Sequence, residues 1–596
     1  MLLLAISVKC SDIIRAGEIV GTIITRKQNN NTYYLYQETY REKINKKDFG
    51  KIRGSGKSKV HTRSTYLGSA ETILQCIKGN RSPVKVNTRN FGLVAAAYQA
   101  AYYIELPQIL SKHINGKRFE TDLWKYFFVT IINRLDCATS KEKMSGWLKK
   151  TILPELLNIK IQNFTGKKFW YATDDVISEK EIEQRRRNTI DEDDPFEYID
   201  DTIFTAIETE LFVRIDQLMG LSPNVICYDT TNFFTYIEEP KRSKIANTCH
   251  SKDSKNHLNH VGLLMAVEKS FGIPLVSRVY RANCHDSKLF SHILADLIVT
   301  LKKLCGTETD LILILDKGNN SKDNFSYMKG KINWIGALVP SHYKDLIDME
   351  LDQYHGSWKD KRYYRCTRNI TDIECVVILT FDAARKRKQA HSLRRGIEKL
   401  KNEITKKWKS YKKTPKNITP GINTMSKKSR YGDCIKISEV KGAPYFEENS
   451  EEIKKREKRF GKSLVFSNML EAETGYLIDT YTEKNIIEND FHLLKDVTLI
   501  RFRPIRHWTD SKIRAFAFCC VVSMILIRIM QWLTEQGGYK MSTTVLKDEL
   551  IDIREVIMIY SSTDAERKIT ARSAVQEKLW KIFELEKIEN QLSLHK

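Results

Sequence analysis

Two aspartates each close a short apolar stretch that is rich in β-forming residues. Asp229 ends the segment VICYD, and Asp316 ends the segment LILILD. A carboxylate at the carboxyl end of a strand is exposed at the rim of a sheet while its backbone stays rigid. Carboxylates are hard ligands for divalent cations, and a pair of such ions can stabilise the attacking and leaving oxygens of phosphoryl transfer. The two aspartates are therefore candidate metal ligands of a phosphoryl-transfer site.

A helix expected over residues 480–497 offers the third carboxylate. Tyr481, Lys484 and Glu488 share one face of this helix, because residues three and four apart lie one turn apart. Lys495 lies two turns beyond Glu488. This spacing favours Glu488 as the third acid, with Asp490 as the alternative. The tyrosine and the two lysines are candidate phosphate contacts, and a solvated amphipathic face is the other interpretation.

The net charge points to a polyanionic partner. The chain has 98 Lys and Arg residues against 74 Asp and Glu residues, which gives a net charge of +24 and a pI of about 9.3. Each phosphate that a basic residue neutralises releases condensed counterions and so favours binding. Residues 385–430 carry 17 Lys and Arg against two acids, a net charge of +15. This segment is interpreted as a DNA-tracking surface or, alternatively, as a solvated helix, and its first four basic residues are candidate DNA contacts: Arg385, Lys386, Arg387 and Lys388.

The spacing of the helix residues resembles a family signature. The pattern Y-x2-[R/K]-x3-E-x6-K is similar to the tyrosine–arginine–glutamate–lysine signature of insertion-sequence DDE transposases, in the insertion-sequence-four-like branch; it is formed here by Tyr481, Lys484, Glu488 and Lys495. The contexts YDTTNFF around Asp229 and LDKGNNS around Asp316 also resemble that family, as does RPIRHW at 503–508. The resemblance covers roughly residues 224–530, and the first 80 residues more faintly. Lys484 stands where the family usually has arginine, which keeps the charge but loses the planar fork for phosphate.

The resemblance implies a DNA transposase of a prokaryotic insertion sequence. Asp229, Asp316 and Glu488 would be its catalytic residues and would bind two Mg²⁺ ions, with Mn²⁺ able to substitute. The enzyme would cut double-stranded DNA at the element ends, and the exposed 3′-hydroxyl would attack target DNA without a covalent protein intermediate. Tyr481, Lys484 and Lys495 would contact DNA. The active species would be a homodimer in the cytoplasm, associated with the nucleoid and not with a membrane.

Residues 224–340 must position the two aspartates. Strands are expected at 225–229, 261–267 and 273–279, a helix at 286–304, and two further strands at 311–316 and 335–339. This order is that of the ribonuclease H fold, which has three strands, then a helix, then a strand. As in that fold, acids end the first and fourth strands. The apolar run 515–527 is expected as a buried helix because it is too short to span a bilayer, and residues 1–8 are expected as a buried strand.

The predicted fold class is α/β, with an RNase H-like catalytic core whose mixed sheet has flanking helices. A β-rich insertion interrupts this core, and an N-terminal β segment and a helical domain precede it. The expected domains are an N-terminal β segment (1–80), a helical DNA-binding domain (81–190), an acidic linker and helix (191–223), the first part of the core (224–340), the insertion with its basic helix (341–475), the second part of the core with the catalytic glutamate (476–535) and a C-terminal helical region (536–596).

Three further features have plainer interpretations. Cys249, His250, His257 and His260 match no standard zinc spacing, so zinc binding is the minor interpretation. Trp358 and Trp408 are expected to pack against protein, although either could stack on an unpaired base. The 12 cysteines form no CxxC pair and are expected to be reduced thiols.

Two rival functions remain open: an RNase H-like nuclease or resolvase without strand transfer, and a DNA-binding protein without catalysis.

Overall fold

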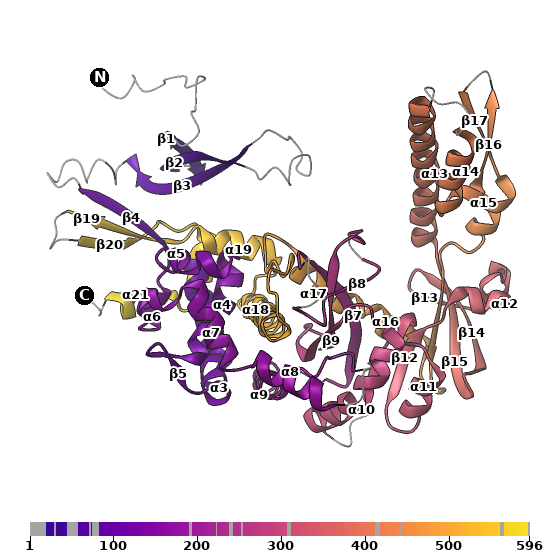
Figure 1. Ribbon diagram of the computed structural model, residues 1–596, viewed down its shortest axis with the longest axis horizontal. Helices are drawn as coiled ribbons and strands as arrows, with labels where there is room; N and C mark the ends of the chain where they lie inside the picture. The colour runs from indigo at the N-terminus through magenta and orange to yellow at the C-terminus, as the bar shows by residue number, and fades with distance from the viewer. Residues whose placement is uncertain are drawn as a thin grey trace. The chain divides into compact units, whose positions relative to one another are not determined.

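The computed structural model describes most of the chain between residues 20 and 593. The described ranges are interrupted at 29–30, 44–57, 71–72, 74–82, 190–193, 222, 238–241, 252–253, 307–310, 412–417, 441–442 and 561–564. The strand expected at residues 1–8 lies outside the described residues. The chain is mixed α/β, as predicted, and forms two compact units (Figure 1). Unit 1 comprises Met1–Tyr103, Gly116–Ala172 and Ile529–Lys596, and unit 2 comprises Ile104–Asn115 and Thr173–Arg528.

Unit 1 joins the two ends of the chain. Strands β1 (Val20–Gln28), β2 (Asn31–Lys43) and β3 (Ser58–Ser69) form one antiparallel sheet. In a second sheet, β4 (Lys85–Asn90) pairs with β19 (Arg554–Ile559), which pairs with β20 (Ala565–Ile569). The C-terminal region, expected to be helical, thus also supplies a β-hairpin, and it packs with residues more than 400 positions earlier.

The helices of unit 1 surround a small apolar core. Because the Ala-rich α2 (Gly92–Tyr103) has no bulky side chains over much of its length, α4 (Leu123–Asp136) and α19 (Thr543–Ile551) can pack directly against it. A Cβ at Gly92 would lie 2.4 Å from the carbonyl oxygen of Leu550, so this close approach requires glycine. Further helices of this unit are α5 (Met144–Leu148), α6 (Leu153–Leu156), α20 (Ala574–Ile582) and α21 (Leu585–Ser593).

Unit 2 is built on a ten-stranded mixed sheet. Its first five strands have the order β10-β9-β7-β11-β12, where β7, β11 and β12 are parallel and β9 and β10 run antiparallel to their neighbours. The bounds are β7 Val225–Thr235, β9 Asn259–Glu268, β10 Pro274–Arg281, β11 Ile312–Ile314 and β12 Asn333–Ala337. The short β8 (Asn247–Thr248) pairs with β9. All five strands expected in residues 224–340 are present, with shifted ends.

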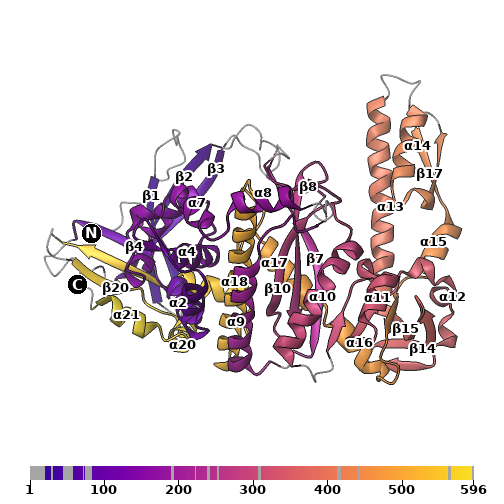
Figure 2. The same cartoon turned by 60° about the horizontal axis from the view of Figure 1, so that its bottom comes forward.

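Helices pack on this part of the sheet. Helix α17 (Asn485–Lys495) contacts β7, and α9 (Thr202–Met219) contacts β10 (Figure 2). Helix α10 (Asp286–Cys305) connects β10 to β11, and α11 (Lys322–Met328) connects β11 to β12. In the part of the chain that the structure describes, α18 (Asp510–Gln536) is the one helix whose length and composition would suit a membrane span. However, 89% of its apolar stretch is buried within the protein, which confirms the expected buried helix.

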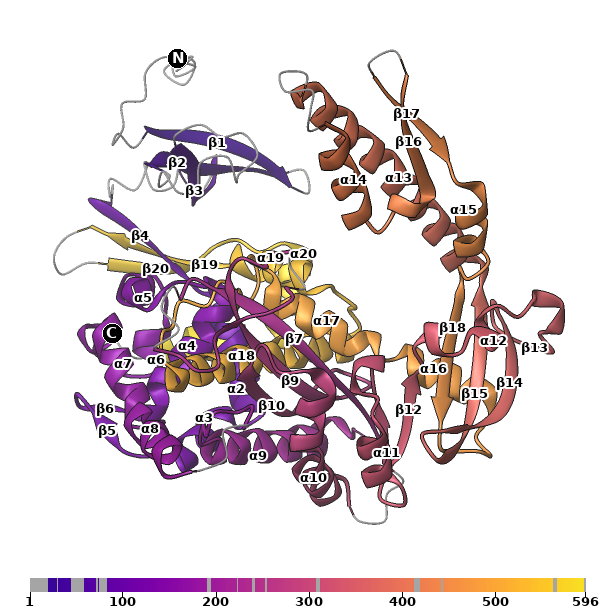
Figure 3. The ribbon, with the colours of Figure 1, turned by 45° about the vertical axis from the view of Figure 1, so that its right-hand side comes forward.

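Residues 341–475 do not form a separate β domain. Strand β18 (Lys462–Ser467) pairs with β12, and β15 (Ile373–Asp382), β14 (Lys361–Ile370) and β13 (Gly356–Trp358) follow in the same sheet (Figure 3). The expected insertion therefore begins and ends with strands that extend the core sheet. Residues 383–460, between β15 and β18, leave it, and the segment before β13 contains the short helix α12 (Lys344–Ile347).

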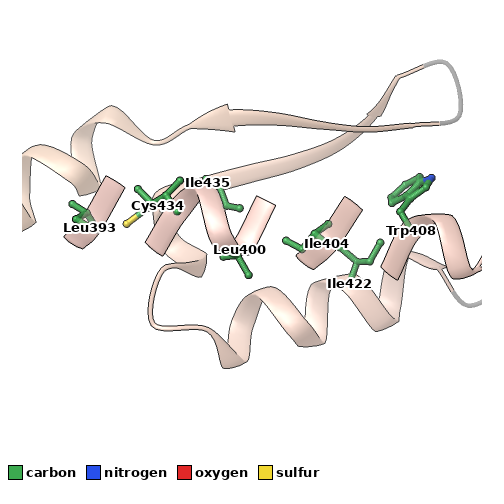
Figure 4. Close-up of a cluster of buried hydrophobic side chains, with 8 residues drawn as sticks. Leu393, Leu400, Ile404, Trp408, Ile422, Cys434 and Ile435 are labelled. Carbon is green, nitrogen blue, oxygen red and sulfur yellow. The ribbon is translucent and has the colours of Figure 1, made fainter. Parts of the chain in front are cut away.

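Residues 383–460 form a subdomain with its own apolar core. It contains α13 (Ala383–Tyr411), α14 (Ile418–Lys428), the hairpin of β16 (Ile435–Val440) and β17 (Ala443–Glu448), and α15 (Ser450–Glu457). Apolar residues recur along one face of α13 at the helical period. The buried cluster that they form with the neighbouring elements consists of Leu393, Ile397, Leu400, Ile404, Trp408, Ile422, Cys434 and Ile435 (Figure 4). Trp408 is part of this core, which confirms its expected packing.

Candidate active site

Asp229 and Asp316 lie side by side at the rim of the sheet of unit 2. The parallel ladder between β7 and β11 ends at the pair Cys227 and Ile314. Asp229 is two residues beyond the first of these, and Asp316 is two residues beyond the second. Because the strands are parallel, both carboxylates emerge at the same edge. The expectation that β7 ends at Asp229 is wrong, since β7 continues to Thr235 by pairing with β9 alone.

Lys484 brings the three predicted acids together. It lies where α16 (Thr474–Thr482) is followed by α17, and its Nζ is 3.3 Å from an oxygen of Asp316, 3.8 Å from one of Glu488 and 3.9 Å from one of Asp229. The side chain of Lys484 is only 9% exposed, and that of Asp229 is 13% exposed. Asp316 and Glu488 are 39% and 55% exposed. The cluster is therefore closed beneath Asp229 and open to solvent at the other two acids.

The charges in this cluster stabilise one another. Burial opposes the charged form of Asp316, but the Lys484 ammonium, together with the backbone N–H and the charge of Lys317, holds the pKa of Asp316 below its ordinary value. Burial also opposes the charge of Lys484, yet Asp229 and Asp316 together raise its pKa. Three carboxylates and one ammonium leave a formal charge of −2 at the rim. The site therefore attracts cations.

Glu488 and Asp490 point to different environments. Glu488 lies four residues after Lys484 and joins the acid cluster. Asp490 is buried on another face of α17, where it forms an ion pair with Arg528, and burial raises its pKa to about 7. A Cβ on Gly272 would lie 2.7 Å from Asp490, so that turn fits closely over the carboxylate. Of the two candidates, Glu488 is the one that the fold brings to the two aspartates.

The other two residues of the helical pattern have different surroundings. Tyr481 is partly buried one turn before Lys484, and burial raises the pKa of its hydroxyl to about 12, with Asp316 and Glu488 among the contributing charges. Lys495 ends α17, and its Nζ is 5.6 Å from the ring centre of Phe233 on β7. Lys484 itself is held by carboxylates, so the predicted phosphate contact would require it to leave them.

Asp286 is a fourth acid near the site that the sequence analysis missed. It begins α10, and its carboxylate accepts a hydrogen bond of 3.0 Å from the hydroxyl of Thr230, the residue after Asp229. A Cβ on Gly318, two residues after Asp316, would be 3.0 Å from the same carboxylate. Asp286 thus lies between the backbone segments that carry both aspartates. Its position in the first turn of a helix is common for an acid, which gave it no distinguishing signal.

The carboxylates of Asp229, Asp316 and Glu488 are suitable ligands for a divalent cation, although the ammonium of Lys484 lies between them. Carboxylate oxygens are the ligands that Mg²⁺ prefers. Within the described ranges, no group of three His, Cys, Asp or Glu side chains is close enough together to hold a metal ion as it stands. The acids instead surround the ammonium. Their chemistry fits the predicted ions, and Lys484 would have to leave the acids for them to bind one.

The remaining candidate residues lie apart from the acids. Arg385, Lys386, Arg387 and Lys388 are all exposed in the first turns of α13. Trp358 is partly exposed, and a Cβ on Gly475 would touch its ring, so it packs against the start of α16. Cys249, His250, His257 and His260 form no metal-binding group in the described part of the chain, and the cysteines described there are free thiols.

Comparison with known proteins gives a distant structural likeness. No protein-family model matches the sequence, and no curated protein is significantly similar to it. Among solved structures, the chain is similar to the piggyBac transposase in a synaptic complex with hairpin DNA, at 10% sequence identity and a TM-score of 0.38. The superposition covers 78% of this chain and 82% of that chain. The function of this chain has to be inferred from its own residues.

Proposed function

We propose that this chain is a DDE-type DNA transposase in which Asp229, Asp316 and Glu488 are the catalytic carboxylates. The observation that carries the proposal is their convergence on the single ammonium of Lys484, from β7, from the end of β11 and from α17. The three acids are 87 and 172 residues apart in the sequence. Three acids chosen by spacing and family resemblance alone therefore meet within one cluster.

The strand order supports an RNase H-like core. Numbered along the chain, the five strands of residues 224–340 lie in the order 3-2-1-4-5, with the second antiparallel to the first and the fourth and fifth parallel to it. Asp229 belongs to the first strand and Asp316 follows the fourth. In open α/β sheets, binding sites form outside the carboxyl ends of the strands, and the two acids lie at such an edge.

The residues divide the work of DNA cleavage between them. Asp229 and Asp316 are fixed by the sheet, while the exposed Glu488 can approach a substrate from the helix side. Mg²⁺, or Mn²⁺ in its place, would supply charge stabilisation and an activated water when two ions are bound. Lys484 balances the negative charge of the acids before substrate arrives. The exposed side of the cluster leaves room for a DNA phosphate.

The finer parts of the proposal concern the biological setting. The enzyme would act on the ends of a prokaryotic insertion sequence and join them to target DNA, as a homodimer, because two ends must be processed together. It would work in the cytoplasm on the nucleoid. The basic helix α13 and the helices of unit 1 would bind double-stranded DNA, which the net charge of +24 favours.

The test is metal-dependent cleavage by purified full-length protein. Asp229→Asn and Asp316→Asn should each abolish cleavage of DNA carrying the inverted repeats that flank the gene, while binding of the same DNA survives. Asp352→Asn, at an exposed acid away from the cluster, is the matched control and should cleave normally. Retained cleavage by either active-site variant would refute the assignment.

Strand transfer separates the transposase from the nuclease alternative. With precleaved ends and a supercoiled target, a transposase joins the 3′-hydroxyl to the target in the presence of Mg²⁺. A nuclease or resolvase of the same fold would cut and release, without joined product. Cleavage without any joined product would therefore favour the nuclease.

A further inference from the structure

Two exposed aromatic side chains belong to segments that meet at the carboxyl end of β7: Tyr236 directly follows the strand, and Trp508 is three residues after Ile505, which is hydrogen-bonded to that strand. Trp508 is 57% exposed, and the guanidinium carbon of Arg242 is 5.2 Å from the centre of its ring. Tyr236, just beyond β7, is 51% exposed, and its ring makes an edge contact with Phe234. Large aromatic residues contribute most to stability when buried. Their exposure here, beside a cation, points to a binding surface.

The backbone fixes this aromatic pair to the strand that carries Asp229. Ile505 N–H donates to the carbonyl of Phe234 at 3.2 Å, and the Thr235 hydroxyl donates to the carbonyl of Ile505 at 2.9 Å. Beyond Trp508, the buried carboxylate of Asp510 accepts hydrogen bonds from Ser243 and from the backbone of Lys244. Trp508 is therefore held between the end of β7 and the segment that contains Arg242.

Basic side chains lie on the segments between the acid cluster and Trp508. Lys495 lies over Phe233, and Arg503 Nε donates to the carbonyl of Lys495 at 3.1 Å. Arg242, which lies over Trp508, is exposed, as are Lys244, Arg501 and Arg506 in the same two segments. Of the described acids nearby, Asp496 accepts hydrogen bonds from Thr498, and Asp510 is buried against Arg186. Residues 238–241 lie outside the described ranges. Those residues include Glu238 and Glu239, and among the described residues of these segments the cations outnumber the acids.

The length of β7 beyond Asp229 gives the distance from the acid cluster to the end of the strand. Six residues separate Asp229 from Thr235, and each residue of a strand advances about 3.3 Å, so Asp229 is roughly 20 Å from Thr235, the residue to which the segment of Trp508 is bonded. Successive base pairs of B-DNA are about 3.4 Å apart. DNA that follows β7 would therefore reach Trp508 about six nucleotides from the phosphate at the acids.

We infer that DNA leaves the acid cluster along β7 and that Trp508 stacks on an unpaired nucleobase about six nucleotides from the reacting phosphate. The cations hold the phosphates on either side, and the indole face supplies the stacking, which tolerates any base. A paired base offers no open face, so an unpaired nucleotide is the ligand. This inference rests on the proposed function only for the position of the phosphate.

The experiment uses full-length protein, without divalent metal, and duplexes of about 30 base pairs. Each duplex carries one unpaired 2-aminopurine, placed from about two to about ten nucleotides from a 3′ end. The parent protein should quench the fluorescence most at about six nucleotides. Trp508→Ala should remove this maximum and weaken binding of that probe roughly tenfold. Trp508→Phe, which keeps an aromatic face, should restore most of both effects.

Two further variants serve as controls. Tyr327→Ala removes another exposed aromatic ring, in α11, whose centre is 3.4 Å from the Nζ of Lys331. It should leave the fluorescence profile unchanged. Arg506→Gln should weaken paired and unpaired probes alike and lower the log–log salt slope by about one unit.

The outcomes separate this inference from the proposed function. A flat profile for the parent protein, or the same profile for Trp508→Ala, would overturn the inference whether or not the enzyme cleaves DNA. Conversely, a Trp508-dependent maximum in a protein that cleaves no DNA would support the binding surface and count against the transposase. Because Trp508 is exposed, its substitution should leave the melting temperature unchanged, and that measurement guards against misfolding.

Discussion

Replacing Lys484 with methionine should destabilise unit 2 at neutral pH, because the three acids would lose the cation between them. The side chains of Lys484 and Asp229 are both nearly buried, with 3.9 Å between their charged atoms. At an effective dielectric constant of about 20, such a pair attracts by about 4 kcal/mol before desolvation is counted. Asp316 and Glu488 are more than a third exposed, so water reduces each of their contributions to about 1 kcal/mol or less. A net loss of about 2–4 kcal/mol is expected, since breaking a buried pair leaves charge unbalanced.

The pH dependence gives the sign of this effect. Lys484 holds the pKa of Asp316 below its usual value of 3.8, so this stabilisation is present above that pH and is lost as pH falls through the lowered pKa. The pKa of Lys484 is raised above 10.5, so its contribution persists until the pH rises through that raised value. The difference between parent and Lys484→Met should therefore be largest near pH 7 and shrink toward pH 3.

Urea unfolding, followed by tryptophan fluorescence at several pH values, measures this difference. Lys484→Arg keeps the charge and should restore most of the stability. Mg²⁺ should stabilise Lys484→Met more than it stabilises the parent, because a divalent cation would replace the missing charge. Equal stability of Lys484→Met and parent at pH 7, with no change in response to Mg²⁺, would refute the electrostatic role of Lys484.

Three other substitutions test separate parts of the structure. Burial raises the pKa of Asp490 to about 7, so its contribution to stability declines as pH rises from about 4 to 7, and Asp490→Asn should flatten that decline in urea titrations. A decline that persists in the variant would assign it to other groups. Trp408→Ala should cost about 3–5 kcal/mol, because the buried indole fills the core of residues 383–460, and hydrogen exchange should show faster opening of that subdomain alone. Unchanged exchange there would contradict the packing. Replacing Arg385, Lys386, Arg387 and Lys388 with glutamine should weaken binding of specific and unrelated duplexes by similar factors, most visibly at low salt. Selective loss of end binding would assign α13 another role.

The strand order and the acids could be predicted because local pattern and spacing determine them. Apolar runs of strand length bounded by turn residues gave all five strands of residues 224–340. The expectation of one helix over residues 480–497 is wrong, because α16 ends at Thr482 and α17 begins at Asn485, but the spacing of Lys484 and Glu488 still selected the glutamate that reaches the acid cluster. The end of β7 could not be predicted, because it depends on pairing with β9, which lies about 30 residues later.

Features that depend on long-range pairing were missed. Strands β13, β14, β15 and β18 look like an independent β-rich insertion, since nothing local shows that β18 pairs with β12. Likewise, the pairing of β4 with β19 joins the two ends of the chain in one unit. The role of Lys484 was also hidden, because a lysine in a helix gives no sign of the carboxylates that the fold brings to it.

The most direct test of the central claim is a measurement of cation binding by the acid cluster. Calorimetric titration of the full-length protein with Mn²⁺ should show saturable binding that is lost or strongly weakened in Asp229→Asn, Asp316→Asn and Glu488→Gln. Binding should be retained in Asp352→Asn and Asp490→Asn, whose acids lie outside the cluster. If the parent binds no Mn²⁺, or if the three cluster variants bind it as the parent does, these carboxylates are not the metal site of a DNA-cleaving enzyme.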